Sequence, residues 1–201
     1  MYKKFEKRFN KTMVVINPGE YYTSTDNEII STVLGSCIAV CLYDEVNNIA
    51  GMNHFMLVGD LRDERIFMEP SARYGIFAME VLINDIIKKG GKKENLKAKV
   101  FDGGHVLNYK TREGNVVDNN IRFAVTFLKL EKIPIVNQDV GGYQGRKILF
   151  FTDTYKVLVK KLRSTVSKEI QQEIKQEQAY VKRLQQEQTA HKDNERINFF
   201  E

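Results

Sequence analysis

Short hydrophobic runs separated by polar turns dominate the first half and the end of the chain. Two nearly continuous runs, residues 29–43 and 49–58, flank the polar connector 44–48, a pattern typical of a β-hairpin with a longer loop. The first run is interrupted at Gly35-Ser36. Further runs predict strands over the ranges 97–101, 133–136, 147–151 and 156–162. Strands are therefore expected to form most of the core, and most of them are expected to be antiparallel.

Two other stretches carry hydrophobic residues at the three- and four-residue spacing of an amphipathic helix. The first begins near Ser71, a favourable N-cap residue, and ends before Gly90-Gly91. Its apolar positions are Tyr74, Phe77, Ala78, Val81, Leu82 and Ile86. The second begins at Asp118 or Asn119 and ends before Pro134. Together these elements predict an α+β fold in which helices pack on a mostly antiparallel sheet core.

The composition changes near residue 167, where Gln, Glu and Lys become dominant. A long helix is predicted there, with a sparse apolar stripe at Val166, Ile170, Ile174, Val181 and Leu184. Such a helix could pack on the domain or fray into solvent, or it could bind a partner or form a coiled coil. Three regions are therefore expected: a flexible basic arm at 1–12, a folded domain at 13–165 and a C-terminal helical extension at 166–201.

Composition and charge exclude several classes of protein. The chain has 201 residues, of which 42% are hydrophobic, and this fraction is too high for a disordered chain. No apolar run approaches the roughly 20 residues of a membrane-spanning helix, and residues 13–16 are too few for the apolar core of a signal peptide. A cytoplasmic protein without membrane insertion is therefore expected.

The net charge of +5 does not indicate nucleic-acid binding. Residues 1–12 contain five basic side chains and one acidic side chain, whereas the rest of the chain is nearly balanced. Proteins that bind nucleic acid concentrate basic residues on a folded face. No nucleic-acid partner is expected.

The two cysteines, Cys37 and Cys41, are expected to be free thiols. No second pair of Cys or His residues completes a zinc pattern, and no metal or organic cofactor is predicted. In a strand, side chains four residues apart lie more than about 10 Å from each other, which is beyond the reach of a disulfide.

Cys37 and His54 are candidate catalytic residues because the predicted hairpin brings them together. If the turn is centred between Glu45 and Val46, then Cys37 faces His54, and directly opposed Cβ atoms lie ~4.5–5.5 Å apart. An imidazole at that range can activate a thiol as a nucleophile. A shift of the register by one residue would separate the pair, and Cys37 could also be a buried structural residue.

Other residues near this pair are candidates for supporting roles. The Gly35-Ser36 sequence permits an unusual backbone that could aim N–H groups at an oxyanion. Cys41 is predicted to be structural, since its expected partner Ala50 does not titrate. A third polar group could orient His54, and the nearby candidates are Ser31, Thr32, Ser36 and Asn53.

The sequence resembles the CheD family of chemoreceptor glutamine deamidases over roughly residues 14–162. The resemblance is carried by STVLGSCIAVCLYD at 31–44 and GMNHFML at 51–57. It continues in ARYG at 72–75, AME at 78–80, KVF at 99–101, IPIV at 133–136, DVGG at 139–142, GRK at 145–147 and VLVK at 157–160. One departure is Asp102-Gly103-Gly104-His105, where the family usually has Gly-Gly-Ala; this could alter the loop or the substrate side of the site.

The resemblance implies a layered α/β sandwich and a cysteine hydrolase without cofactors. Its substrates would be glutamine side chains on the cytoplasmic helical bundle of methyl-accepting chemotaxis receptors, and the products would be glutamates. Cys37 would be the nucleophile and His54 the general base. The third member, a Thr six residues before the cysteine in the family, falls on Ser31, with Thr32 next to it.

The resemblance leaves two alternatives to a deamidase. The family also forms complexes with a CheC-type phosphatase of the response regulator, so the chain could act mainly as an adaptor that stimulates such a phosphatase. A transglutaminase or protease using the same pair of residues is the third class considered.

Overall fold

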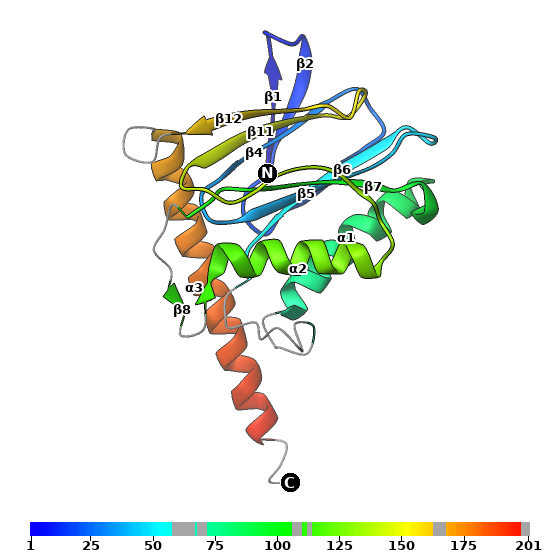
Figure 1. Ribbon diagram of the computed structural model, residues 1–201. Coiled ribbons are helices and arrows are strands. Elements are labelled where there is room, and N and C mark those ends of the chain that lie inside the picture. The colour runs from blue at the N-terminus through cyan, green and yellow to red at the C-terminus, as the bar shows by residue number, and fades with distance from the viewer. Residues whose placement is uncertain (58–66, 68–71, 106–109, 112–113, 163–167, 198–201) are drawn as a thin grey trace.

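The protein consists of two stacked β-sheets with helices against one of them (Figure 1). The computed structural model describes residues 1–57, 67, 72–105, 110–111, 114–162 and 168–197. The predicted N-cap Ser71, the stripe residue Val166 and the predicted domain boundary at 165/166 lie outside these ranges. The expected α+β class, with layered and mostly antiparallel sheets, is confirmed.

Each large sheet has five strands, and each contains one parallel pair. In order across the first sheet, the strands are β1 (Tyr2–Glu6), β2 (Lys11–Val15), β4 (Ile29–Leu34), β11 (Gly145–Phe151) and β12 (Val157–Leu162). Across the second sheet they are β10 (Ile135–Asp139), β7 (Lys97–Asp102), β5 (Ile38–Asp44), β6 (Ile49–Phe55) and β3 (Tyr21–Ser24). A small two-stranded ladder joins β8 (Lys110–Thr111) to β9 (Gly114–Asn115).

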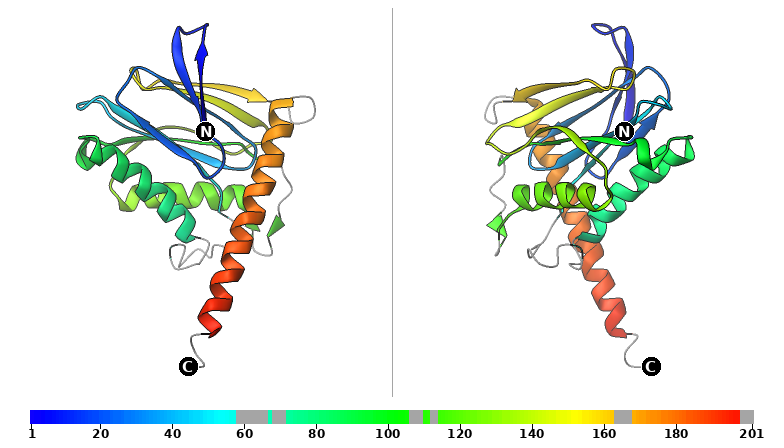
Figure 2. Two further views of the ribbon diagram at one scale, coloured as in Figure 1. Left: turned by 180° about the vertical axis from the view of Figure 1, so that it is seen from behind. Right: turned by 45° about the vertical axis from the view of Figure 1, so that its right-hand side comes forward.

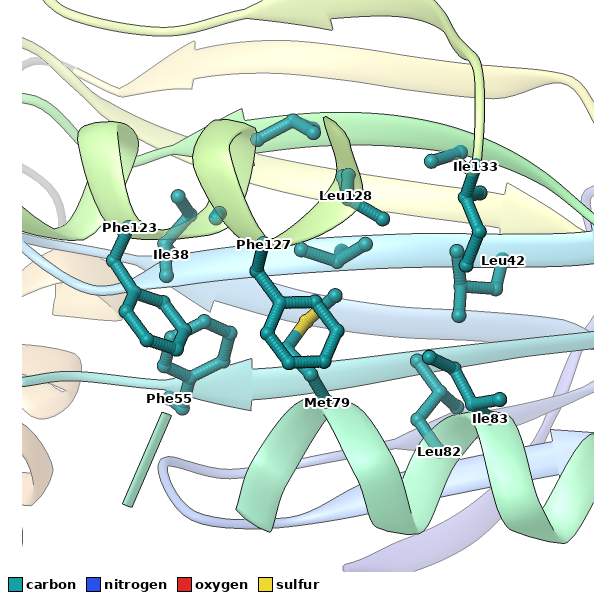
Figure 3. Close-up of a cluster of buried hydrophobic side chains, with 14 of the residues drawn as sticks. Ile38, Leu42, Phe55, Met79, Leu82, Ile83, Phe123, Phe127, Leu128 and Ile133 are labelled. Atoms are coloured by element: carbon teal, nitrogen blue, oxygen red, sulfur yellow. The ribbon is translucent and has the colours of Figure 1, made fainter. Parts of the chain in front are cut away.

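The helices are α1 (Ala72–Lys88), α2 (Val116–Leu130) and α3 (Lys168–Ile197), and a 3-10 turn spans Lys93–Asn95. Helices α1 and α2 cover the outer face of the second sheet (Figure 1). Figure 3 shows Phe123 and Phe127 of α2 and Met79 of α1 packed over strands β5 and β6. None of the described helices is both long and apolar enough to cross a membrane.

The buried face of α1 differs from the predicted one. Phe77, expected in the core, is 67% exposed, whereas Gly75 and Met79 are buried. A Cβ atom at Gly75 would lie 2.5 Å from the ring of Phe123. The absence of a side chain at Gly75 therefore lets α2 approach closely, and this contact sets the rotation of α1 about its axis.

The apolar run 29–43 is divided between the two sheets. Strand β4 belongs to the first sheet and β5 to the second, so the interruption at residues 35–37 is the point where the chain crosses from one sheet to the other. The β5–β6 hairpin is confirmed, but the predicted register is wrong by two positions.

The observed turn of the hairpin is centred one residue later than predicted, between Val46 and Asn47. Asp44 pairs with Ile49, and Ala39 rather than Cys37 pairs with His54. The Asp44 carboxylate accepts hydrogen bonds from the backbone N–H groups of Val46 and Asn47, which stabilises a four-residue loop. Cys41 accordingly pairs with Met52 instead of Ala50. Because side chains alternate with a period of two, a shift of two keeps Cys37 and His54 on the same face.

Residues 1–12 contribute to a β-hairpin, in contrast to the flexible arm that was expected. Strand β1 pairs along its whole length with β2 at the edge of the first sheet. Lys3 hydrogen-bonds Glu28 at 3.0 Å, and Lys11 hydrogen-bonds Asp153 at 2.7 Å. These contacts hold the basic residues against the domain.

The C-terminal extension is the long helix α3. The views in Figure 2 show α3 crossing one end of both sheets, with its second half projecting beyond the helical layer. Its buried residues in the described part are Ile170, Glu173, Glu177 and Leu184. Two of them are the predicted stripe residues, but the two glutamates between them were not expected in a buried position.

Candidate active site

The site is built around the chain crossing between the two sheets. Cys37 is fully buried immediately before β5, and its carbonyl accepts a hydrogen bond from the Gly103 N–H at 3.1 Å. The preceding Gly35 lies so close to the carboxyl group of Glu177 that a Cβ atom there would lie 2.7 Å from Glu177 Oε2. A glycine at position 35 therefore leaves space for a polar group directly beside the Cys37 backbone.

His54 is held by hydrogen bonds on both its backbone and its ring. Its N–H donates to the carbonyl of Glu20 at 2.9 Å, and its carbonyl accepts from the N–H of Gly19 at 2.7 Å. Ring atom Nδ1 lies 2.8 Å from the hydroxyl oxygen of Thr32. These three contacts fix the imidazole at the end of β6.

The Thr32 contact also assigns the tautomer of His54. A hydroxyl group has one proton to donate, and Thr32 donates it to the carbonyl oxygen of Ile16 at 2.8 Å. The Thr32 oxygen therefore accepts from His54, which places the ring proton on Nδ1. Nitrogen Nε2 is then unprotonated and available as a base.

Of the two candidate hydroxyls, the structure brings Thr32 to His54 and directs Ser31 away from it. Ile30 and Leu34 of β4 belong to the core between the sheets, and Thr32 shares their side of the strand. Ser31 lies on the opposite side, against a cavity of about 190 Å³ on the outer face of the first sheet. The placement of Ser31 as the orienting residue therefore disagrees with the geometry.

The remaining polar candidates have other contacts. Asn53 accepts a hydrogen bond from the N–H of Val40 at 3.0 Å and donates to the carbonyl of Ala78 at 2.8 Å, on the helical side of the second sheet. Ser36 is buried beside Cys37, and its N–H donates to Glu177 at 2.9 Å. The Asn53 side chain therefore lies on the face of β6 opposite to that of the neighbouring His54.

Three consecutive backbone N–H groups converge on one oxygen atom beside the thiol. The N–H groups of Gly35, Ser36 and Cys37 donate to Oε1 of Glu177 at 2.9, 2.9 and 3.1 Å. Such a run of N–H groups forms a binding site for a negatively charged oxygen. The position occupied by this oxygen is therefore suited to an oxyanion that forms during attack by Cys37.

Cys37, His54 and Glu177 form one compact cluster. A sulfur, a ring nitrogen and a carboxyl oxygen from these residues lie within 4.8 Å of one another. Of the described residues, these are the group with donor atoms close enough to hold a metal ion. The Glu177 oxygens, however, already accept backbone hydrogen bonds, so the same geometry has an explanation without a metal.

Burial shifts the pKa values of the cluster toward neutral side chains. Burial lowers the pKa of His54 to about 3. Burial, together with the nearby carboxyl groups of Glu177 and Glu173, raises the pKa of the Cys37 thiol well above its usual value. A thiolate–imidazolium pair of Cys37 and His54 is therefore disfavoured while α3 covers the site.

Glu173 is the second acidic residue that α3 places in the site. Its Oε1 lies 3.7 Å from Nε2 of His54, and neither atom has a hydrogen-bond partner among the described residues. Burial and the neighbouring Glu177 raise the pKa of Glu173 to about 9. An acidic side chain in this position disfavours a thiolate at Cys37.

Asn120 of α2 supports the loop that carries Cys37. Its side-chain amide donates to the carbonyl of Ser36 at 3.2 Å and accepts from the N–H of Leu57 at 2.8 Å. The fully buried Asn120 therefore joins the Cys37 loop to the chain just beyond His54. The only sequence signal for this role is a polar residue on the apolar face of a predicted helix.

Asp102, one of the unusual residues of the 102–105 segment, belongs to a buried network of hydrogen bonds. Arg146 donates to both the carbonyl and the carboxyl group of Asp102, at 2.7 and 3.3 Å, and to Asp139 at 2.7 Å. Gly141 N–H donates to the same Asp102 carboxyl at 2.7 Å. Burial raises the pKa of Asp102 to about 6. The network fixes the loop whose Gly103 contacts Cys37.

Comparison with known proteins decides the family. The family described as "CheD chemotactic sensory transduction" matches residues 56–161. The chain belongs to the CheD family. A protein of Methylobacillus flagellatus named "Probable chemoreceptor glutamine deamidase CheD" is 45% identical over 181 residues, which cover 90% of this chain and 87% of that protein. The CheD membership expected from the sequence motifs is therefore confirmed.

Other CheD relatives give the same result. "Probable chemoreceptor glutamine deamidase CheD 1" of Shewanella oneidensis is 44% identical, over 80% of this chain and 77% of its own length. A Janthinobacterium relative is 44% identical over 90% and 87% of the two chains. Among solved structures, YfiH of Bacillus licheniformis has a TM-score of 0.37 and 13% identity, over 60% of this chain and 50% of that one. This last similarity is too weak to bear on the CheD fold.

Proposed function

We propose that this CheD chain hydrolyses the side-chain amide of glutamine residues in chemoreceptors, with Cys37 as nucleophile and His54 as general base. The relatives are named for this activity. The observation that carries the proposal is the convergence of three backbone N–H groups on one oxygen beside the thiol of Cys37. An amide carbonyl at that position would receive all three hydrogen bonds as negative charge develops on its oxygen.

The first half of the reaction forms a thioester and releases ammonia. Nε2 of His54 takes the thiol proton, and the Cys37 sulfur forms a bond to the amide carbon. The carbonyl oxygen gains charge against the N–H groups of residues 35–37; one donor of this kind contributes about 3 kcal/mol in comparable sites. The carbon–nitrogen bond then breaks, and protonated His54 gives its proton to the leaving ammonia.

The second half restores the enzyme. Water gives a proton to His54 and forms a bond to the thioester carbon, and the carbon–sulfur bond breaks. The Cys37 sulfur recovers a proton, and the product is a glutamate side chain. Thr32 supports both halves as a positioning residue because its hydroxyl keeps the imidazole proton on Nδ1. Apart from the water that is consumed, each step uses the side chains and backbone described.

The test is to incubate the full chain with a chemoreceptor fragment and to follow the mass of its glutamine-containing peptides. Deamidation is expected to add one dalton at defined glutamines, and Cys37→Ala is expected to abolish the change. Cys41→Ala is the matched control, since Cys41 is an equally buried thiol on the adjoining strand. Crosslinked or cleaved products instead of the mass gain would identify a transglutaminase or a protease. The complex with a CheC-type phosphatase stays a prediction.

A further inference from the structure

Helix α3 places two glutamates on its buried face. Ile170, Glu173, Glu177 and Leu184 follow one another at spacings of three, four and seven, which lie on one side of a helix. Ile170 and Leu184 pack as ordinary apolar contacts near the ends of this stretch. Glutamate is rarely buried without a specific partner, so the two central positions require a separate explanation.

The partner of Glu177 is the oxyanion site of the proposed reaction. Besides the three bonds to Oε1, the Ser36 N–H also reaches Oε2 at 3.0 Å. The carboxyl group also hydrogen-bonds the Cys37 thiol. A glutamate side chain is the product of glutamine deamidation and has the same shape as the substrate. Glu177 thus places a carboxyl group, the product of deamidation, beside the thiol and the N–H groups that would act on the substrate.

We propose that α3 is an intramolecular occupant of the active site, in which Glu177 takes the place of the deamidated side chain, and that substrate enters only after α3 leaves. The inference rests on the proposed function, because it assigns the Cys37 site to glutamine amides. It also identifies the form of the substrate. Since the occupant reaches the site from a helix, the surface beneath α3 accepts a glutamine presented on the face of a helical partner.

The contacts of α3 are compatible with its release. The described residues on the other side of the helix are exposed and mostly polar, and they include Gln171, Gln172, Lys175 and Gln178. Within the interface, Glu173 is buried beside Glu177, and its Oε1 has no hydrogen-bond partner in the part of the chain that the structure describes. Two neighbouring buried carboxyl groups oppose docking, so a helical partner without this feature can compete for the surface.

The first experiment measures access to Cys37 independently of catalysis. The full chain is treated with iodoacetamide, and alkylation of Cys37 and Cys41 is quantified separately by peptide mass spectrometry. Glu177→Ala is expected to speed alkylation of Cys37 at least tenfold without changing Cys41. Gln178→Ala, at the exposed neighbouring position, is the matched control and should leave both rates unchanged. An unchanged Cys37 rate in Glu177→Ala would overturn the proposal that α3 closes the site.

The second experiment uses α3 as its own substrate. Glu177→Gln introduces an amide of the same shape at the occupied position. Cys37 is expected to convert it back to glutamate in a single turnover, which is detected as a mass gain of one dalton in the peptide containing position 177. The double variant Cys37→Ala/Glu177→Gln should retain the amide. Glutamines at 176 and 178 in the same peptide serve as internal controls.

The outcomes separate the two proposals. Faster alkylation in Glu177→Ala with conversion at position 177 supports both. Faster alkylation with active receptor deamidation but no conversion would overturn the product-like placement of Glu177. Faster alkylation with neither receptor deamidation nor conversion would overturn the proposed function while the occlusion by α3 stands. Slower receptor deamidation by Glu177→Ala than by the unaltered chain would instead make Glu177 part of the catalytic machinery and overturn its role as an occupant.

Discussion

The hydroxyl of Thr32 lies 2.8 Å from Nδ1 of His54, although Thr32 is on the first sheet and His54 is on the second. This hydrogen bond joins the two layers at the site. It also fixes the ring tautomer, since Thr32 donates its own proton to Ile16. The orientation of the proposed base therefore depends on how the two sheets are stacked.

Replacing Thr32 is expected to lower catalysis through the tautomer of His54. Thr32→Val keeps the shape but removes the acceptor, and we expect kcat for receptor deamidation to fall about 100-fold. Thr32→Ser, which retains the hydroxyl, should restore most of the activity. Ser31→Ala is the matched control and should stay within about threefold of the unaltered chain. A larger loss for Ser31→Ala than for Thr32→Val would contradict the assignment.

Asn120 is expected to act as a positioning residue for Cys37. Asn120→Ala leaves the buried N–H of Leu57 without its acceptor, which should reduce the free energy of unfolding by about 1–3 kcal/mol. Loss of the bond to Ser36 should in addition lower kcat while leaving KM nearly unchanged. Asn119→Ala on the same helix turn is the control, and urea unfolding and deamidation kinetics are the measurements. Equal kcat values for the two variants would rule out the positioning role.

Docking of α3 is expected to weaken as pH rises. The pKa of Glu173 is about 9 in the docked state, against an ordinary value of 4.5, and that of Glu177 is raised in the same direction. Burial of His54 acts in the opposite sense below about pH 6.5, so the window is the range above it: between about pH 6.5 and pH 9 the docked state binds more protons than the released state, and raising pH favours release. Glu173 faces Glu177 and His54, and Lys4 and Lys147 line the adjoining cavity.

Amide hydrogen exchange checks this pH dependence. Protection of residues 168–187, corrected for intrinsic exchange and compared with that of α1, should decrease from pH 6.5 to pH 9. Glu173→Gln should remove much of the dependence and increase protection at high pH. Glu169→Gln removes an exposed α3 carboxyl group that pairs with Lys147; its overall protection should fall, but the dependence of protection on pH should stay like that of the unaltered chain. Protection that stays constant with pH in the unaltered chain would contradict the shift.

Arg146 is expected to be a major contributor to stability. Arg146→Met leaves the fully buried Asp102 without its cation, and removing one partner of a buried ion pair typically costs about 3–5 kcal/mol. Arg146 also donates to the carbonyl of Gly141 at 2.9 Å. Arg146→Lys should recover only part of the loss, because one ammonium cannot reach Asp102, Asp139 and Gly141 in the same geometry. Lys156→Met at an exposed position is the control. A loss below about 1 kcal/mol in urea unfolding would contradict the network's role.

The sequence by itself determined most of the local elements, the family and the placement of Cys37 and His54 on the same side of the predicted hairpin. Most strand and helix positions follow from hydrophobic spacing, which is a local property of the chain, although β1 was expected to be part of a flexible arm. The shared side survived a register error of two residues because a shift of two preserves the face of a strand. Had the loop after Asp44 been one residue longer or shorter, the prediction would have failed.

Only the tertiary structure decided which hydroxyl orients His54 and what covers Cys37. Ser31 and Thr32 differ by one position on β4, and the stacking of the second sheet selects the residue that faces His54. Glu177 reaches the N–H groups of residues 35–37 across 140 positions of sequence. The spacing of Glu177 from Ile170 and Leu184 places these residues on one face of a helix. This local pattern does not specify which surface of the protein the face covers.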